Sequence, residues 1–203
     1  MKIGPKYKIA RRLGPLVFEK TQTQKFQLSE ARHARKKSDK RPKQLSDFGL
    51  QLIEKQRVRF SYGITERQLS NYVIKASEMK GGNTGEKLYG MLESRLDNVV
   101  YRLGIAHTRR LARQMVSHGH FVVNGKRTTV PSYAVSQGDV VTVREGSKKS
   151  VLFTELAKKL ENYSTPKWLR FDVAKLEAKI DGQPALEAGG AFNLNTVLEY
   201  YSR

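Results

Sequence analysis

Apolar residues recur at helical spacing in two consecutive stretches near the middle of the chain. The first stretch predicts an amphipathic helix that ends at Gly104, because apolar residues three or four positions apart lie on one helix face. A second helix is expected to begin after Thr108, a residue type that caps helix N-termini, and to present Leu111 and Met115 to the core. The apolar face of the first helix consists of Leu92, Leu96, Val99, Val100 and Leu103.

Short strands are predicted directly after these helices. Gly119 suits the left-handed conformation that often ends a helix, and Phe121 to Val123 are typical of a strand. Asn124-Gly125 is the dipeptide most typical of a tight hairpin turn, since both of its residues tolerate positive φ. Gly138-Asp139 indicates a further turn that leads into a strand over Val140 to Val143. Helices beside a small antiparallel sheet are therefore expected.

The N-terminal part of the chain divides into a basic stretch and a helical stretch. Residues 1–41 contain few apolar residues and no sustained period, so no core is expected within them. Ser46 and Thr65 are expected to cap two helices, and Asn83, with Glu86 three positions later, to start a long helix that continues into the central segment.

Three further elements are predicted on the C-terminal side. Val151 to Leu160 indicate a short amphipathic helix, and Trp168 to Val173 a strand. The final helix is predicted over Leu194 to Tyr201, where apolar residues recur at i, i+3, i+4 and i+7. So short a helix is marginal by itself in water and is expected to pack against another part of the protein.

The charge of the chain indicates an anionic partner. Its 203 residues carry a net charge of +19 and have a pI near 10.2. Residues 1–60 hold 17 basic against 5 acidic side chains, whereas residues 150–203 hold 7 of each. A nucleic acid, an anionic membrane surface or an acidic protein could supply the opposite charge. No apolar run is long enough to span a membrane, so the expectation is no membrane partner.

The sequence offers little chemistry for catalysis or metal binding. It contains no cysteine, which excludes disulfides and thiolate metal ligands. His118 and His120 lie two positions apart, a spacing that does not match zinc motifs. Neither a nucleophile elbow nor a phosphate-binding loop of Walker type is present. We therefore expect no metal, no cofactor, no small-molecule substrate and no enzymatic activity.

Basic side chains crowd one face of the second central helix. Arg109 and Arg113 are four residues apart, and Arg110 adds a third guanidinium. No acidic side chain within one helical turn can neutralise them, so we expect all three to contact phosphates. Lys126, which follows the hairpin turn, is also well placed for a phosphate, whereas Asn124 can simply serve the turn.

Two arginines of the first central helix leave two interpretations open. Arg95 and Arg102 lie seven residues apart and share a face. Each can contact RNA directly, and Arg95 can equally form an internal ion pair with Asp97 or Glu93. These carboxylates lie among arginines and are expected to pair with them rather than to perform acid-base chemistry.

The chain resembles the family of ribosomal small-subunit protein number four over nearly its whole length. The central segment resembles that family's small RNA-binding module, which is also appended to several RNA-modifying enzymes. Both ends match the full-length family in the same order, which is the more specific observation. The matching pieces include Gly4-Pro5-Lys6, Leu92-Glu93-x-Arg95-Leu96-Asp97, Thr108-Arg109-x-x-Ala112-Arg113-Gln114, Val123-Asn124-Gly125-Lys126 and Leu198-Glu199-Tyr200-Tyr201-Ser202-Arg203.

The resemblance implies an α+β fold. It consists of a helical domain with an inserted domain of helices packed on a small antiparallel β-sheet, plus a basic N-terminal arm. The arm would comprise residues 1–42, the helical domain residues 43–86 and 187–203, and the inserted domain residues 87–186, with the RNA-binding module at about 92–150. Some family members have a cysteine zinc site near the N-terminus, which this cysteine-free chain cannot form.

The resemblance also implies a function in the ribosome of a cytoplasm or a plastid. The protein would bind small-subunit ribosomal RNA, nucleate assembly of the subunit body, contact small-subunit protein number five and contribute to translational accuracy. The implied RNA-binding residues are Arg95, Asn98, Arg102, Thr108, Arg109, Arg110, Arg113, Gln114, His118, Asn124, Lys126, Arg127, Arg32, Arg35, Lys36 and Lys37. The residues implied near the channel through which mRNA enters are Arg41, Lys43, Lys55, Arg57 and Arg59.

Two other classes of protein carry the same module. An RNA-modifying enzyme such as a pseudouridine synthase would need a separate catalytic domain, for which the chain has no room. A stand-alone module protein that rescues stalled subunits would be shorter and would lack the matched ends.

Overall fold

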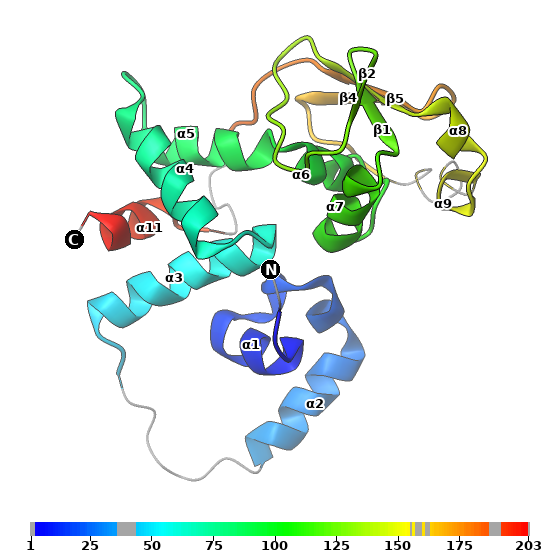
Figure 1. The fold of residues 1–203 in the computed structure, drawn as a ribbon. Coiled ribbons are helices and arrows are strands. Elements are labelled where there is room, and N and C mark those ends of the chain that lie inside the picture. Colours follow the sequence, from blue (N-terminus) through cyan, green and yellow to red (C-terminus); the bar gives the residue numbers. More distant parts are fainter. Residues whose placement is uncertain are drawn as a thin grey trace. The chain divides into compact units, whose positions relative to one another are not determined.

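The computed structural model describes residues 3–35, 44–154, 156, 160, 163–186 and 192–202 (Figure 1). The chain divides into two compact units. The first unit comprises Met1–Leu88 together with Glu187–Arg203, and the second comprises Tyr89–Leu186. Helices make up the described part of the first unit, and the second combines helices with a sheet, so the α+β fold is confirmed.

The N-terminal segment of the first unit has a small core, so the expectation of none was wrong. Helix α1 (Lys6–Leu13) is followed by two 3₁₀ turns, η1 (Pro15–Val17) and η2 (Glu19–Gln22), and by helix α2 (Gln24–Arg35). Because the apolar residues fall in short helical turns of different types, they show no single period along the sequence. The buried core residues are Ala10, Leu13, Val17, Phe18 and Phe26.

Three further helices follow, and their starts are fixed by side-chain caps, as predicted. Ser46 accepts a hydrogen bond from Gly49 N at the start of α3 (Asp47–Tyr62). Thr65 forms a capping box with Gln68 at the start of α4 (Glu66–Glu78). Asn83 Oδ1 accepts a hydrogen bond from Gly85 N, 2.8 Å away, at the start of α5 (Thr84–Glu93).

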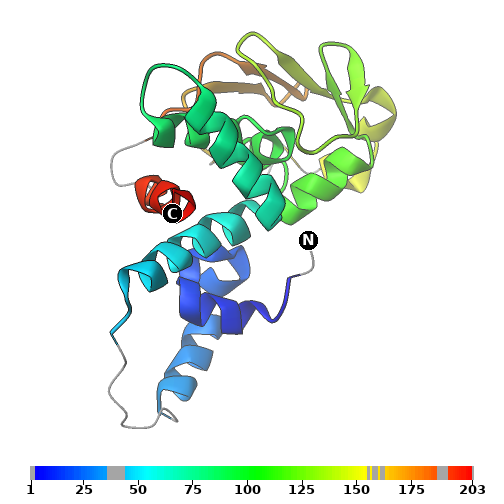
Figure 2. The same ribbon diagram turned by 60° about the vertical axis from the view of Figure 1, so that its left-hand side comes forward.

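The C-terminal helix α11 (Leu194–Tyr201) packs on α3 and α4, as its marginal length requires (Figures 1 and 2). Tyr200 stacks against Phe48 with ring centroids 5.5 Å apart. The Tyr201 hydroxyl donates to Glu66 Oε1 at 2.7 Å, and the same oxygen accepts a hydrogen bond of 2.8 Å from Lys55 Nζ. Residues far apart in the sequence therefore complete one helical unit.

The Glu66 carboxylate is expected to make the stability of the first unit pH-dependent. Burial acts to raise the pKa of Glu66, but hydrogen bonds from Lys55 and Tyr201 and the charges of Lys55 and Arg59 lower it below the ordinary value of 4.5. Because the folded pKa is the lower one, the carboxylate stabilises the folded state above pH 4.5, and this contribution is lost as the pH falls through the folded pKa. Glu66→Gln should therefore lose less free energy of unfolding than the wild type on acidification.

Urea unfolding between about pH 6 and pH 3 measures this difference. The matched control is Glu30→Gln, which changes an exposed carboxylate on α2 and should retain the acid sensitivity of the wild type. Equal acid sensitivity in all three proteins would contradict the assignment.

The second unit contains two central helices and a five-stranded antiparallel sheet. Helix α6 (Leu96–Arg102) and helix α7 (Arg109–Ser117) precede strands β1 (Phe121–Val123) and β2 (Lys126–Thr128). Strands β3 (Val140–Val143), β4 (Leu169–Asp172) and β5 (Glu177–Ile180) complete the sheet in the order β2-β1-β3-β5-β4. The short helices α8 (Glu145–Lys148) and α9 (Val151–Thr154) follow β3.

The β1–β2 turn has the predicted geometry, with positive φ at both of its residues. The predicted long helix, by contrast, is interrupted. Arg95 is extended between α5 and α6 and forms an isolated antiparallel β-bridge with Ala134. Strand β5 was not predicted. The predicted helix over Val151 to Leu160 begins as α9, and several of its later residues lie outside the described part.

One hydrophobic core joins the helices and the sheet of the second unit. Leu96 and Val99 from α6, Met115 from α7, Phe121 from β1 and Val141 from β3 are all buried in it. These contacts place α6 and α7 against the sheet and fix the orientation of their polar faces.

Candidate nucleic-acid interface

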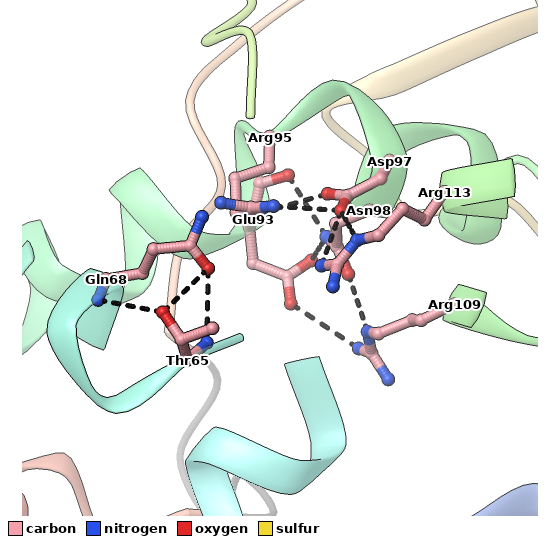
Figure 3. Close-up of polar contacts among 8 residues, drawn as sticks. All are labelled: Thr65, Gln68, Glu93, Arg95, Asp97, Asn98, Arg109 and Arg113. Carbon is pink, nitrogen blue, oxygen red and sulfur yellow. Dashed lines mark hydrogen bonds and ion pairs between the residues drawn. The ribbon is translucent and has the colours of Figure 1, made fainter. Parts of the chain in front are cut away.

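Asp97 lies at the start of α6 with its side chain buried, and two arginines pair with it (Figure 3). Arg95 donates from Nε to Oδ1 at 3.0 Å and from Nη2 to Oδ2 at 2.9 Å. Arg113 on α7 donates to Oδ2 from Nε at 2.8 Å and from Nη2 at 2.7 Å. Arg95 itself is only 2% exposed. Of its two open interpretations the structure has the internal ion pair, and the burial of this side chain is at odds with direct contact with RNA.

Glu93 at the end of α5 is the second buried carboxylate, and it organises three side chains. Arg102 donates to it from Nε at 2.7 Å and from Nη2 at 2.8 Å. Asn98 donates from Nδ2 to Glu93 Oε2 at 2.9 Å and accepts from Arg109 Nε at 2.8 Å. The Arg109 guanidinium also lies 4.3 Å from the centre of the Tyr101 ring and 4.0 Å from Glu93 Oε1. Arg109 is thus held by a hydrogen bond, a cation–π contact and a nearby charge.

These residues form one polar cluster, here called the arginine cluster. Four guanidinium groups face two carboxylates in it, which leaves a net charge of +2. The side chains of Arg102 and Arg113 are 31% and 28% exposed, so the excess charge reaches the surface. The cluster consists of Glu93, Arg95, Asp97, Asn98, Arg102, Arg109 and Arg113.

The expectation that no carboxylate neutralises Arg109 and Arg113 was wrong. That expectation counted only acidic side chains within one helical turn of the arginines. Asp97 reaches Arg113 from the adjacent helix, 16 residues away in sequence. The general expectation that Glu93 and Asp97 pair with arginines is confirmed. What sequence reasoning missed is that these two carboxylates position the basic face.

The other predicted RNA-binding residues of this unit divide into two groups. Thr108 caps α7 by accepting from Leu111 N at 3.1 Å, and Asn124 holds its turn by accepting from Val140 N at 2.9 Å and donating to Asp139 at 2.8 Å. The remaining predicted residues of the unit are exposed on α7, after its end or on β2: Arg110, Gln114, His118, Lys126 and Arg127.

Gly119 allows Arg127 to approach the end of α7. Its φ is +72°, and a Cβ atom at this position would lie 2.4 Å from Arg127 Nε. Arg127 Nη2 also donates to the carbonyl oxygen of His118 at 3.3 Å. A residue with a side chain at position 119 would therefore have both a strained backbone and a displaced arginine.

Gly119→Ala is expected to lower the free energy of unfolding by about 1–2 kcal/mol, the cost of a left-handed conformation with a side chain. It should also weaken RNA binding, because Arg127 must move. Gly125→Ala is the matched control, since Gly125 has φ +78° but no atom within 4 Å of an added Cβ. Urea unfolding and RNA titration should show similar destabilisation in both variants and an affinity loss in the first alone. Equal affinities would argue against a role for Arg127.

The basic residues predicted in the first unit have different surroundings. Arg32 is exposed on α2. Lys55 is 4% exposed and pairs with Glu66, which is at odds with the predicted direct contact of this side chain with mRNA. Arg57 pairs with Glu54 and donates to the carbonyl oxygen of Leu13 at 2.8 Å. Arg59 pairs with Glu66 at 3.3 Å and remains partly exposed. The side chain of Arg35 and the residues Lys36, Lys37, Arg41 and Lys43 lie outside the described part.

Neither a metal site nor a membrane-spanning helix appears in the described ranges. No three histidine, aspartate or glutamate side chains there are grouped to hold a metal ion. None of the helices in these ranges combines the length and the apolar character needed to cross a bilayer.

Comparison with known proteins extends over the whole chain. Residues 94–141 match the S4 domain, and residues 1–93 match the ribosomal protein S4/S9 N-terminal domain. Small ribosomal subunit protein uS4 of Sulfurihydrogenibium sp. (strain YO3AOP1) is 44% identical, and the match covers 98% of each chain. The uS4 protein of Methylibium petroleiphilum is 44% identical over 99% of this chain and 98% of its own length.

The chain belongs to the uS4 family. A third uS4 protein, from Oenococcus oeni, is 43% identical over 98% of this chain and 97% of its own length. The uS4 family consists of structural ribosomal proteins rather than enzymes. This chain is a cysteine-free uS4 member. The S4 domain match contains α6, α7 and strands β1 and β2, and it begins one residue after Glu93.

Proposed function

We propose that this protein is a structural component of the small ribosomal subunit that binds small-subunit ribosomal RNA. The observation that supports this most directly is the arginine cluster, in which two buried carboxylates orient four arginines and leave a net charge of +2. All members of the cluster except Glu93 lie in the S4 domain match. RNA phosphates would supply the balancing negative charge. The family membership of the full chain supports the ribosome as the place of binding.

The protein would bind RNA mainly by contacting its phosphate backbone and by recognising its folded shape. Side chains cannot read the narrow major groove of A-form RNA, so arginines and lysines that contact phosphates fix the orientation of the protein on a folded junction. Arg102, Arg109 and Arg113 would act from fixed positions, since ion pairs and hydrogen bonds already restrict their rotamers. Arg110, Lys126 and Arg127 would add exposed charges. Arg95 and Asn98 would act as positioning residues.

The finer roles follow from the family resemblance. We propose that the protein binds early, nucleates assembly of the subunit body and contributes to translational accuracy through contact with small-subunit protein number five. Arg57 and Arg59, which are partly exposed on α3, would lie near the incoming mRNA. Arg32 and the other basic residues near it would add phosphate contacts. The site of action would be the ribosome of a bacterial cytoplasm or of a plastid.

Co-sedimentation with small ribosomal subunits tests this function. The tagged protein should remain bound in a one-to-one ratio through washing at high salt, because a folded RNA site held by many contacts dissociates slowly. Purified protein should also bind small-subunit ribosomal RNA with an affinity that falls steeply with salt, by several units of log affinity per unit of log salt for roughly six to eight phosphate contacts. Loss from the subunits on washing, or a flat salt dependence, would refute the proposal.

A further inference from the structure

A second group of basic side chains gathers where α7 ends and β1 begins. His118 is the C-cap residue of α7 and His120 directly precedes β1, with ring centroids 6.0 Å apart. Arg127 on β2 reaches the glycine between them, and its Nη2 donates to the carbonyl oxygen of His118 at 3.3 Å. Arg144, directly after β3, donates from its backbone N to the carbonyl oxygen of His120 at 2.8 Å. These four residues, His118, His120, Arg127 and Arg144, are here called the histidine cluster.

The histidine cluster concentrates positive charge without a counter-charge. Burial lowers the pKa of His120 below its ordinary value of 6.5, and the charges of His118, Arg144 and Arg127 lower it further. Within the part of the chain that the structure describes, no carboxylate pairs with any of the four residues. Glu145, next to Arg144 in sequence, is 86% exposed and pairs with Lys148 instead. A metal cation would be repelled here, whereas an anion would be attracted.

The ring of His120 is held in one orientation by the short helices that follow β3. Its Nδ1 lies 3.0 Å from Oγ of Ser147, a buried residue of α8. Its face is flanked by Phe153 of α9, with ring centroids 5.9 Å apart in an edge-to-face arrangement. A protonated imidazole donates from both nitrogens, so Nδ1 can donate to the Ser147 hydroxyl while Nε2 donates to a ligand. The exposed ring of His118 can donate beside it.

We propose that the histidine cluster binds one phosphate of the ribosomal RNA, and that this contact strengthens when the two histidines gain protons. Arg127 connects the cluster to the exposed cations of α7 and β2, which already form the proposed RNA-binding face. With both imidazoles neutral the two arginines give the cluster a charge of +2, and with both protonated the charge is +4. The inference rests on the proposed RNA-binding function and adds a pH-dependent contact to it.

The direction of the pH dependence follows from linkage. A bound phosphate favours the charged imidazole, so the pKa of each histidine is higher in the complex than in the free protein. RNA binding therefore takes up protons, and the affinity rises as the pH falls from about 8 towards 5.5. A histidine whose pKa rises by about one unit on binding contributes up to about tenfold.

Ribosomal RNA binding at two pH values provides the first test. Between about pH 8 and pH 5.5 at constant salt, the wild type should gain about three- to tenfold more affinity than the double variant His118→Gln, His120→Asn. Asparagine retains a polar group near Ser147, and if the double variant does not fold, His118→Gln alone should lose part of the gain. The matched control, His33→Gln with His107→Gln, removes two other exposed histidines and should keep the wild-type gain.

Titration of the RNA itself affects all of these proteins equally, so the difference between them reports the histidine cluster. Equal gains in the wild type and in a folded double variant would overturn the RNA contact.

Sulfate provides a second test that does not depend on RNA. The full-length protein, with carbon-13 in its histidine rings, is titrated with acid in sodium sulfate and in sodium chloride of the same ionic strength. Sulfate is a tetrahedral dianion whose charge is constant over this range. It should raise the pKa of His118 and His120 more than chloride does, while His33 and His107 respond equally to both salts. Equal responses of all four histidines would overturn the anion site.

The two tests together separate this inference from the proposed function. A selective sulfate response with no difference in RNA affinity between the wild type and the double variant would assign the site to another anion, such as a carboxylate of a protein partner, and would overturn the RNA contact. A wild-type protein without affinity for the RNA at either pH would refute the proposed function itself, and the sulfate titration would still decide whether the cluster binds an anion.

Discussion

Asp97→Ala is expected to lower the free energy of unfolding by about 3–5 kcal/mol, the usual effect of removing one partner of a buried ion pair. Asp97 is the carboxylate that pairs with Arg95, which is only 2% exposed, and it also holds Arg113. RNA affinity should fall as well, because Arg113 would no longer have a fixed orientation. Urea unfolding followed by circular dichroism measures the stability, and a filter-binding titration measures the affinity.

Glu145→Ala is the matched control for this change. Glu145 is 86% exposed and pairs with Lys148 on the surface, so its loss should change stability by no more than about 1 kcal/mol. If Asp97→Ala does not fold, Asp97→Asn, which keeps the size of the side chain, should give an intermediate loss. If a folded Asp97→Ala protein had a free energy of unfolding within about 0.5 kcal/mol of the wild type, a positioning role for this carboxylate would be excluded.

Removal of the exposed cations is expected to give the largest loss of RNA affinity. The triple variant Arg110→Ala, Lys126→Ala and Arg127→Ala leaves both buried carboxylates and their arginine partners in place. If all three side chains contact phosphates, the salt slope should become shallower by about two to three units. The affinity at about 0.1 M salt should then fall on the order of a hundredfold. Stability should change little, because the three residues are exposed.

The control for this triple variant lowers the net charge by the same amount in another part of the chain. Lys167→Ala, Lys175→Ala and Lys179→Ala remove three exposed cations from the part of the chain that has equal numbers of acidic and basic residues. Its affinity and slope should stay close to those of the wild type. The same loss in both variants would show that net charge alone, and not the face around α7 and β2, governs binding.

Local signals in the sequence predicted local structure well. Ser46, Thr65 and Thr108 begin helices because their hydroxyl groups accept from backbone N–H groups that would otherwise lack partners. The hairpin at Asn124-Gly125 forms for an equally local reason, the tolerance of positive φ. These features depend on a few neighbouring residues and were predicted correctly.

Features that depend on long-range contacts could not be predicted in the same way. The period of the apolar residues continues through position 95, but the backbone leaves the helix there because Arg95 forms a β-bridge with Ala134 and an ion pair with Asp97. The partner of Arg113 comes from another helix, so a search within one turn could not find it. The ion pair of Arg113 with Asp97 predicts that Arg113→Ala lowers the stability of the protein.

The separation of α3 from α11 in the sequence has a consequence for synthesis of the chain. Gln51 and Glu199, which are hydrogen-bonded in the folded protein, are 148 residues apart. At translation rates of about 5–20 residues per second, roughly 7–30 s pass between the synthesis of α3 and that of α11. Residues 89–186 are complete earlier and can fold within that time, since small domains commonly fold in seconds or less. The inserted unit should therefore mature first on the translating ribosome, while the surface of α3 that α11 will cover stays open to chaperones.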